Sequence, residues 1–213
     1  MELGVSAAGR FIAFEGGEGA GKSTQARLLA EALEARGIAC VLTREPGGTP
    51  GAEAIRGLLL HPPGEGWDPE AEALLFAAAR ADHVARLIRP ALAAGTWVVS
   101  DRFVDSSRAY QGIAGELGDG TVRALHAIGS AGLLPDLTIV LGAGEDRIGE
   151  RLRARDGDTA DAIGGRDAAY HARVNAAFRE FAAQEPERFA LVDGDGTVEE
   201  VHAWIMAAVA PLW

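Results

Sequence analysis

The chain has 213 residues, of which 48% are hydrophobic and 24% charged, a balance that is typical of a globular protein with one sizeable core. Its apolar runs are broken by Arg, Asp or Gly well before the ~18 residues that a membrane span needs, and residues 1–10 lack the pattern of a signal peptide. The net charge of −11 disfavours a sequence-independent nucleic-acid binder, and the single cysteine, Cys40, excludes an intramolecular disulfide. We therefore expect a cytoplasmic protein that binds neither membrane nor nucleic acid, with Cys40 as a small core residue.

Short apolar segments alternate with helical patterns along the whole chain. Strands are predicted at residues 11–14, 38–43, 97–100, 137–141 and 189–192. Helices are predicted at residues 22–36, 70–94 (interrupted at Pro90), 145–155, 166–184 and 198–209, with a loop around residues 46–50. This alternation predicts an α/β fold, a five-stranded parallel sheet with helices on both faces. We find no internal repeat or linker, so we expect one domain, and residues 156–166 are the best candidate for a mobile flap.

A phosphate-binding loop follows the first strand. Residues 16–23 match the pattern G-x-x-x-x-G-K-[ST] and lie between a predicted strand and a predicted helix, the context that the motif requires. The glycines let backbone N–H groups point inward at an anion, Lys22 supplies a charge to the β- and γ-phosphates, and Ser23 offers a hydroxyl to Mg²⁺. The predicted ATP-binding residues are Gly16, Gly17, Glu18, Gly19, Ala20, Gly21, Lys22, Ser23 and Thr24.

A carboxylate ends the third predicted strand. Asp101 follows the apolar residues 97–100, and the carboxyl ends of parallel strands form the ligand-binding edge of such a sheet. There Asp101 can hold Mg²⁺ directly or through water; the alternative is an Asp that only caps the next turn. The sequence thus predicts an ATP–Mg²⁺ site and a P-loop NTPase fold.

The identity of the phosphate acceptor comes from further blocks of sequence. Four blocks match a known family in their order and spacing. They are residues 11–24, residues 43–49 (Thr-Arg-Glu-Pro-Gly-Gly-Thr), residues 75–80 (Leu-Phe-Ala-Ala-Ala-Arg), and residues 101–103 running into 106–112. Over residues 10–205 the chain resembles the bacterial thymidylate kinases. The resemblance implies transfer of a phosphoryl group from ATP–Mg²⁺ to thymidine monophosphate by a nucleoside monophosphate kinase domain, and it implies a homodimer.

The resemblance assigns the phosphate and sugar contacts of the acceptor. It implies that Arg44 meets the acceptor phosphate and that Arg102 bridges this phosphate and the transferred group, as suits the bidentate guanidinium. Glu18 is expected near the 3′ hydroxyl, and Tyr110 is expected to crowd the 2′ position of the sugar. In isolation, Arg44 could belong to a simple turn and Tyr110 could be packing.

The resemblance also assigns the base contacts. It implies that Phe76 stacks on thymine and that Arg80, four residues further on the same helix face, donates to the carbonyl O4. Ser107 and Gln111 are expected to complete the polar edge. Read alone, Phe76 could be a core residue and Arg80 a solvated charge.

A basic segment follows the fourth predicted strand. The resemblance implies a lid at about residues 145–166 in which Arg151 and Arg153 carry catalytic charge; Arg155 follows at the same spacing. The lid departs from the family pattern in Ala162 and Gly164, and the loop at Gly115 and Glu116 lacks the usual Arg-Gly pair. Arg166 is a candidate replacement cation.

The expected mechanism is in-line attack by the acceptor phosphate, with Lys22, Mg²⁺, Arg102 and the lid arginines neutralising charge and no general base. Two alternatives remain at this stage. One is another small P-loop kinase for a different nucleotide or nucleoside, against which Phe76, Arg80 and Tyr110 argue. The other is a nucleotide-binding switch with little catalysis.

Overall fold

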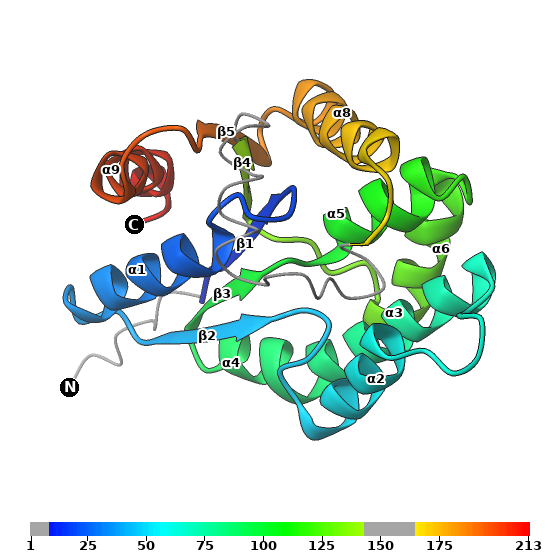
Figure 1. Ribbon diagram of the computed structural model, residues 1–213. Helices are drawn as coiled ribbons and strands as arrows, with labels where there is room; N and C mark the ends of the chain where they lie inside the picture. Colours follow the sequence, from blue (N-terminus) through cyan, green and yellow to red (C-terminus); the bar gives the residue numbers. More distant parts are fainter. Residues whose placement is uncertain (1–8, 143–164) are drawn as a thin grey trace.

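A parallel sheet forms the centre of the molecule. The computed structural model describes residues 9–142 and 165–213, and the five strands within them make one sheet with the order β2-β3-β1-β4-β5 (Figure 1). The strands are β1 (Phe11–Gly16), β2 (Cys40–Arg44), β3 (Trp97–Asp101), β4 (Leu137–Gly142) and β5 (Phe189–Asp193). All their pairings are parallel, which confirms the predicted α/β fold.

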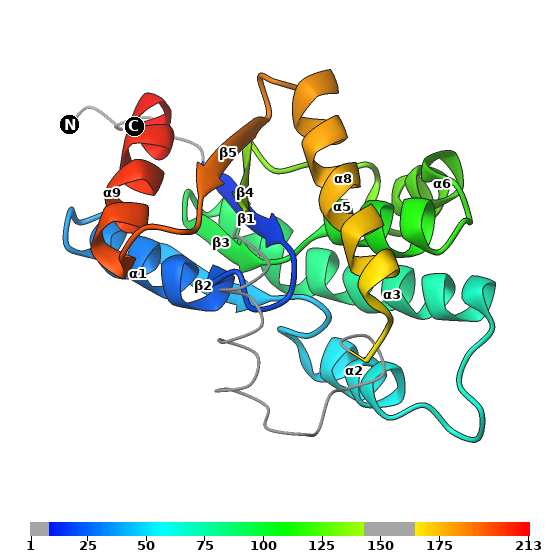
Figure 2. The same cartoon turned by 45° about the horizontal axis from the view of Figure 1, so that its top comes forward.

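Helices cover both faces of the sheet. The helices are α1 (Lys22–Glu34), α2 (Pro50–Leu60), α3 (Pro69–His83), η1 (Val84–Ile88), α4 (Arg89–Ala93), α5 (Val104–Ser107), η2 (Arg108–Ala114), α6 (Asp119–Ser130), α8 (Ala168–Gln184), α9 (Val198–Val209) and η3 (Ala210–Leu212). In both views α1 and α9 lie together on one side of the sheet, while α5, α6 and α8 lie on the other (Figures 1 and 2). None of the helices in the described ranges combines the length and apolarity needed to cross a bilayer.

Alternating side chains of β1 build the core on both faces. Ile12 and Phe14 are buried in a cluster with residues of α1 and α9, while Phe11 and Ala13 are buried with residues of η1, α5 and α6. This alternation is the period-two pattern of a strand covered on both sides. Cys40 is half-buried and packs against the first cluster, and burial raises the pKa of its thiol to about 12. We therefore find Cys40 in the packing role predicted for it.

The segment after β2 differs from the sequence-based prediction. The strand runs from Cys40 to Arg44, two residues later than expected at its start, and a helix, α2, begins at Pro50 where only a loop was expected. Thr49 caps this helix by accepting a hydrogen bond from Ala52 N at 3.3 Å, and Pro50 fits the first helical position because its missing N–H would have no partner there. Helix α6 was also not predicted.

The predicted interruption at Pro90 is wrong. The chain stays helical from α3 through η1 to α4, and η1 is a π-helical turn. In this wide turn Arg89 N donates to Val84 O, five residues back, and Pro90 then lies at the start of α4, where a proline is tolerated. The π turn thus lets the helical run pass the proline.

Register places the functional segments at one edge of the sheet. Asp101 in β3 is level with Phe14 in β1 and with Arg44 in β2. The phosphate-loop motif, the carboxylate that ends β3 and the first arginine of the second sequence block therefore meet at the carboxyl ends of the strands, where ligands bind in sheets of this kind.

Candidate active site

The phosphate loop connects β1 to α1. Gly16, Gly19 and Gly21 have φ values of 129°, 69° and 95°, which side chains rarely tolerate. A Cβ on Gly16 would also lie 2.4 Å from Leu141 O of the neighbouring strand β4. The chain can therefore curl tightly at the start of α1, whose amino end attracts anions.

Lys22 lies inside this loop. Its Nζ donates to Gly17 O at 2.6 Å, and its side chain is buried. Burial, together with the nearby guanidinium of Arg102, lowers the pKa of Lys22 to about 8. A desolvated ammonium held by a loop carbonyl is a strong partner for a phosphate group that enters the loop.

Ser23 and Asp101 form an oxygen pair beside the loop. The Ser23 hydroxyl donates to Asp101 Oδ2. Hydroxyl and carboxylate oxygens are the hard ligands that Mg²⁺ prefers, and in nucleotide sites this ion usually keeps waters and takes one or two protein ligands plus phosphate oxygens. In the described ranges no cluster of three His, Cys, Asp or Glu side chains is placed to hold a metal, so a cage made wholly of protein is not present there. The pair fits a nucleotide-bound Mg²⁺.

Arg102 faces the phosphate loop from the end of β3. Its backbone adopts a left-handed conformation with φ of 72°, and its guanidinium forms an ion pair with Glu18. The same guanidinium donates to Ser106 Oγ at 3.0 Å and lies 5.1 Å from the ring centre of Tyr110. The structure thus brings Glu18 of the first sequence block together with Arg102 and Tyr110 of the fourth.

A cleft of about 330 Å³ opens beside this cluster. It contains every residue that the sequence predicts to contact the acceptor: Glu18, Arg44, Phe76, Arg80, Arg102, Ser107, Tyr110 and Gln111. Lys22, Ser23 and Asp101 also border it, so the cleft runs from the phosphate loop to α3. One continuous space therefore connects the phosphate loop to the side chains of Phe76 and Arg80 on α3.

Arg80 lies at the α3 end of the cleft and is 3% exposed. Its Nε donates to Glu45 Oε2 at 2.7 Å, and its Nη2 donates to Ser107 Oγ at 2.9 Å. These bonds leave Nη1 without a hydrogen-bond acceptor among the residues that the structure describes. Phe76, one turn earlier on α3, supplies an aromatic wall of the same pocket.

Glu45 was not predicted as a site residue. It is buried, and its two carboxylate oxygens contact two residues of α3. Oε2 accepts from Arg80 Nε, and Oε1 lies 3.0 Å from His83 Nδ1. The sequence places Glu45 next to Arg44 in a Gly/Pro segment, which reads as a solvent-exposed turn. Its role becomes visible only in the folded structure, where it contacts Arg80, which lies 35 residues further along the sequence.

Other cleft residues depend on α2 and α8. Arg44 pairs with Glu53 of α2 at 3.1 Å, and Arg56 of α2 also lines the cleft. Gln111 donates to Glu72 at 2.8 Å, and Glu72 in turn accepts from Arg166 at 2.6 Å. Arg166, the candidate replacement cation, is thus bound to α3 in this structure. Arg56 was missed because α2 was not predicted.

The predicted catalytic arginines Arg151 and Arg153 lie outside the described residues, as do Arg155, Ala162 and Gly164 and most of the segment predicted as a flap. Gly115 and Glu116, the other departure from the family pattern, follow η2 and do not line the cleft.

Together, the phosphate loop, its oxygen pair and a cleft that carries arginines at both ends define a small P-loop kinase that acts on a phosphorylated acceptor. Comparison with known proteins specifies the family. Residues 14–205 match the model of the family described as thymidylate kinase, and the chain belongs to this family.

Relatives of high identity agree with this assignment. The chain is 56% identical over 204 residues to a thymidylate kinase of Rhizorhabdus wittichii, with 96% of this chain and 98% of the relative covered. It is 49% identical to a thymidylate kinase of Rhodopseudomonas palustris, with 97% and 90% covered. Among solved structures, the thymidylate kinase of Ehrlichia chaffeensis superposes with a TM-score of 0.78 at 30% identity, covering 95% of this chain and 99% of that one.

Proposed function

We propose that this protein uses ATP and Mg²⁺ to phosphorylate thymidine monophosphate to the diphosphate, as one nucleoside monophosphate kinase domain. Family membership gives the kinase activity and the thymidylate acceptor. The donor and the ion follow from the site: the loop around Lys22 fits a polyphosphate, and the Ser23–Asp101 pair fits its Mg²⁺.

The acceptor would lie along the cleft with its phosphate toward Arg102 and Arg44. Its sugar would pass Tyr110 and Glu18, and its base would lie against Phe76 near Arg80. Ser107 and Gln111 border the same end of the cleft. This direction is supported by the position of Arg102 beside the phosphate loop and by the aromatic wall that Phe76 supplies at α3.

The chemistry would be in-line attack of an acceptor phosphate oxygen on the γ-phosphorus of ATP. The attacking oxygen is already anionic, so no general base is needed, and the rate comes from positioning and charge neutralisation. Lys22 and Arg102 would both supply positive charge to the transferred group. Mg²⁺, when bound, supplies further charge on the phosphate oxygens. Arg151 and Arg153 are proposed to add charge from the segment outside the described residues.

The assembly we propose is a cytoplasmic homodimer. Support comes from helices α3 and α6, which pack against each other. Each exposes a large apolar side chain: Leu74 of α3 is 55% exposed and Ile128 of α6 is 85% exposed. Apolar side chains so exposed on adjacent helices favour a helical interface with a second copy. Sedimentation velocity measures the mass of the assembly directly.

One observation carries the choice of acceptor: the buried guanidinium of Arg80, held by Glu45 and Ser107 with Nη1 left for a ligand. A donor at this position pairs with the carbonyl O4 of thymine and meets the amino group of cytosine as a second donor. Arg80→Ala should therefore lower the ratio of kcat/KM for thymidine over deoxycytidine monophosphate by roughly 10- to 100-fold, the scale of a hydrogen bond to a charged donor.

The matched control is Arg86→Ala. Arg86 is largely exposed and pairs with Asp82 on the surface, so its loss should leave this ratio unchanged. An unchanged ratio in the Arg80 variant would show that Arg80 does not read the base. A wild-type enzyme that phosphorylates another monophosphate better than thymidylate, in a panel assay, would overturn the proposed acceptor itself.

A further inference from the structure

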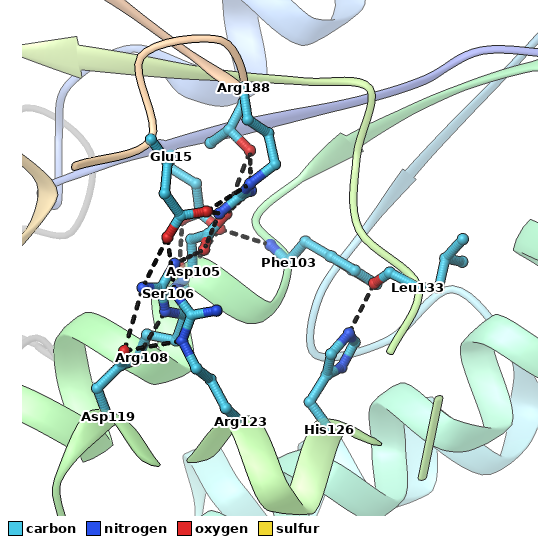
Figure 3. A network of polar contacts seen from close by, with 12 residues as sticks. Glu15, Phe103, Asp105, Ser106, Arg108, Asp119, Arg123, His126, Leu133 and Arg188 are labelled. Carbon is cyan, nitrogen blue, oxygen red and sulfur yellow. Dashed lines mark hydrogen bonds and ion pairs between the residues drawn. The ribbon is translucent and has the colours of Figure 1, made fainter. Parts of the chain in front are cut away.

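A buried carboxylate lies behind the active site and has no role in the chemistry described above. Glu15, the fifth residue of β1, is 0% exposed. It accepts hydrogen bonds from Phe103 N at 2.8 Å, from Ser106 N at 3.0 Å and from Ser106 Oγ at 2.5 Å (Figure 3). All three donors belong to the segment that follows β3, Phe103 directly before α5 and Ser106 within it. The carboxylate therefore binds one short segment of the chain, and this segment begins next to Arg102.

The backbone of this segment needs such support. Arg102 has φ of 72°, an unfavourable conformation for a residue with a side chain. Its N–H donates to Phe14 O at 2.9 Å, and its carbonyl accepts from Ser100 Oγ at 2.7 Å. Glu15 then accepts from the N–H groups of Phe103 and Ser106 further along the segment. The segment is thus hydrogen-bonded to two successive residues of β1, Phe14 and Glu15.

A side-chain connection runs from Glu15 to the guanidinium itself. Ser106 Oγ donates its hydrogen to Glu15 Oε2 and accepts from Arg102 Nη1 at 3.0 Å. Because the hydroxyl has one hydrogen, its donation to Glu15 turns its lone pairs toward Arg102. The orientation of the hydroxyl, and with it one bond of the guanidinium, is set by the carboxylate.

We propose that Glu15 is a positioning residue for phosphoryl transfer, which acts through Ser106 to hold Arg102 in the orientation that meets the transferred group. This inference rests on the proposed role of Arg102 in catalysis. Glu15 touches neither cleft nor substrate, since it does not line the cleft. Its contribution is to the geometry of Arg102 alone.

The electrostatic surroundings are consistent with this role. Burial, with the nearby carboxylate of Asp105, raises the pKa of Glu15 to about 7, while Arg102 and the donors Ser106 and Phe103 oppose this. Asp105 on α5 belongs to the ion-pair network drawn in Figure 3, Lys22 faces Glu15 from α1, and Tyr110 faces it from η2. A protonated Glu15 would place an O–H where the Ser106 hydroxyl needs an acceptor, so the carboxylate form is the one that positions Arg102.

Glu15→Gln tests the proposal because it imitates the protonated side chain. The amide oxygen still accepts from Phe103 N and Ser106 N, but the amide nitrogen cannot accept from the Ser106 hydroxyl. We expect kcat at pH 8 to fall about 10- to 100-fold, the scale of a misplaced catalytic group, with KM for both substrates changed less than about threefold. The decline of wild-type kcat between pH 8 and pH 6 should shrink in the variant toward that set by the substrate phosphate alone.

Ser106→Ala and the double variant locate the effect. If Glu15 acts through Ser106, Ser106→Ala should lower kcat on the same scale, and adding Glu15→Gln should lower it no further. Additive losses would overturn the connection through Ser106. Wild-type kcat in Ser106→Ala would overturn it even if the Glu15 variant did not fold.

Two further variants separate the possible failures. Asp119→Asn is the matched control, because Asp119 accepts from Arg108 and Arg123 in the same polar network and has no bond to the turn after β3; its kcat should be that of the wild type. Arg102→Ala should be nearly inactive. If Arg102→Ala turns over normally, the proposed chemistry fails. If it is inactive while the Glu15 and Ser106 variants have wild-type kcat and pH profiles, only the positioning role fails.

Discussion

Single residues at the phosphate loop have protonation equilibria that the bound nucleotide will change. Lys22 has a pKa of about 8, chiefly because burial disfavours its charged form and Arg102 adds repulsion. The ammonium is thus lost as pH rises through about 8. Anionic phosphates in the loop favour the charged form and should return the pKa of Lys22 toward higher values.

Two pH profiles therefore should differ. kcat/KM for ATP, which reports the free enzyme, should fall as pH rises above about 8, while kcat, which reports the nucleotide complex, should persist to higher pH. The thiol of Cys40 and the phenol of Tyr110 do not confuse the measurement, because burial raises the pKa of each to about 12. A basic limb at the same pH in both profiles would contradict this account. Lys22→Arg, which stays charged, should lack the limb in its residual activity.

At this scale the sequence identifies residues that belong to a motif and misses residues that support one. Lys22 and Ser23 could be predicted because the phosphate-loop motif fixes residue types at short spacing. Arg102 was predicted only through the resemblance to a known family. Glu15 directly precedes that motif, yet its partner Ser106 is 91 positions away and nothing local distinguishes it from an exposed strand-end acid. Glu45 is missed for the same reason. Buried polar partners can be assigned only when the fold has brought distant segments together.

At the scale of elements, α8 is tied to α3 at the edge of the cleft. Arg166, just before α8, donates to Glu72 of α3 at 2.6 Å and also to the Tyr170 hydroxyl, and its guanidinium lies 4.6 Å from the Tyr170 ring centre. Glu72 also accepts from Gln111 of η2. One carboxylate thus joins three elements, one of which carries a proposed base contact.

Arg166→Ala should loosen this junction. Because both partners are partly exposed, we expect a loss of stability of about 1 kcal/mol or less, but a rise of several-fold in KM for thymidylate as Gln111 becomes less well held. Arg173→Ala is the matched control: it lies on α8 and donates to Ala114 O, with no bond to Glu72. Steady-state kinetics and urea denaturation measure both quantities. Equal KM values in the two variants would show that the junction does not reach the substrate.

Elements were predictable where packing imposes a period and not where a special turn decides. Strands β1, β3 and β4 are short apolar runs buried on both faces, so their composition alone indicates a strand. The edge strands β2 and β5 are partly exposed but are still short and rich in apolar residues. Helix α2 begins in a segment rich in Gly and Pro, and helix α6 begins directly after Gly118. Residues of these types are typical of loops, so the sequence predicts that the loop continues. The helix continues past Pro90 because of the π-helical turn η1, and no pattern in the sequence predicts such a turn.

At the scale of the whole molecule, a buried ion network joins the middle of the chain to the segment before β5. Asp105 is fully buried and accepts from Arg188, before β5, at 2.6 Å and from Arg108 of η2 at 2.8 Å. Arg108 also pairs with Asp119 of α6 at 2.7 Å (Figure 3). The carboxylate therefore joins α5 to the segment before β5, which lies 83 residues later in the sequence.

Asp105→Asn should destabilise the protein by about 3–5 kcal/mol, because two buried guanidinium groups would lose one counter-charge. Burial opposes ionisation, but the bonds from Arg188 and Arg108 outweigh it and hold the pKa of Asp105 below its usual value of 3.8. The stabilisation is therefore present above about pH 4 and is lost only as pH falls through the lower native value. Urea denaturation at pH 8 and in acid should show a gap between variant and wild type that narrows in acid. Glu31→Gln, in an exposed pair on α1, should cost less than about 1 kcal/mol. A comparable cost in both variants would contradict the role of the buried network.

The lysine of the phosphate loop is also the one lysine in the 213-residue sequence; apart from the histidines, every other basic side chain is an arginine. Amine chemistry in this protein is therefore confined to the chain's α-amino group and Nζ of Lys22. With a pKa of about 8, that nitrogen is partly neutral and nucleophilic under mildly alkaline conditions. An acylating reagent will thus act as an occupancy probe: the mass added at Lys22 will fall as nucleotide fills the loop, with no background from surface lysines. Acylation there also deletes the charge of the loop, so labelling and inactivation should proceed in step.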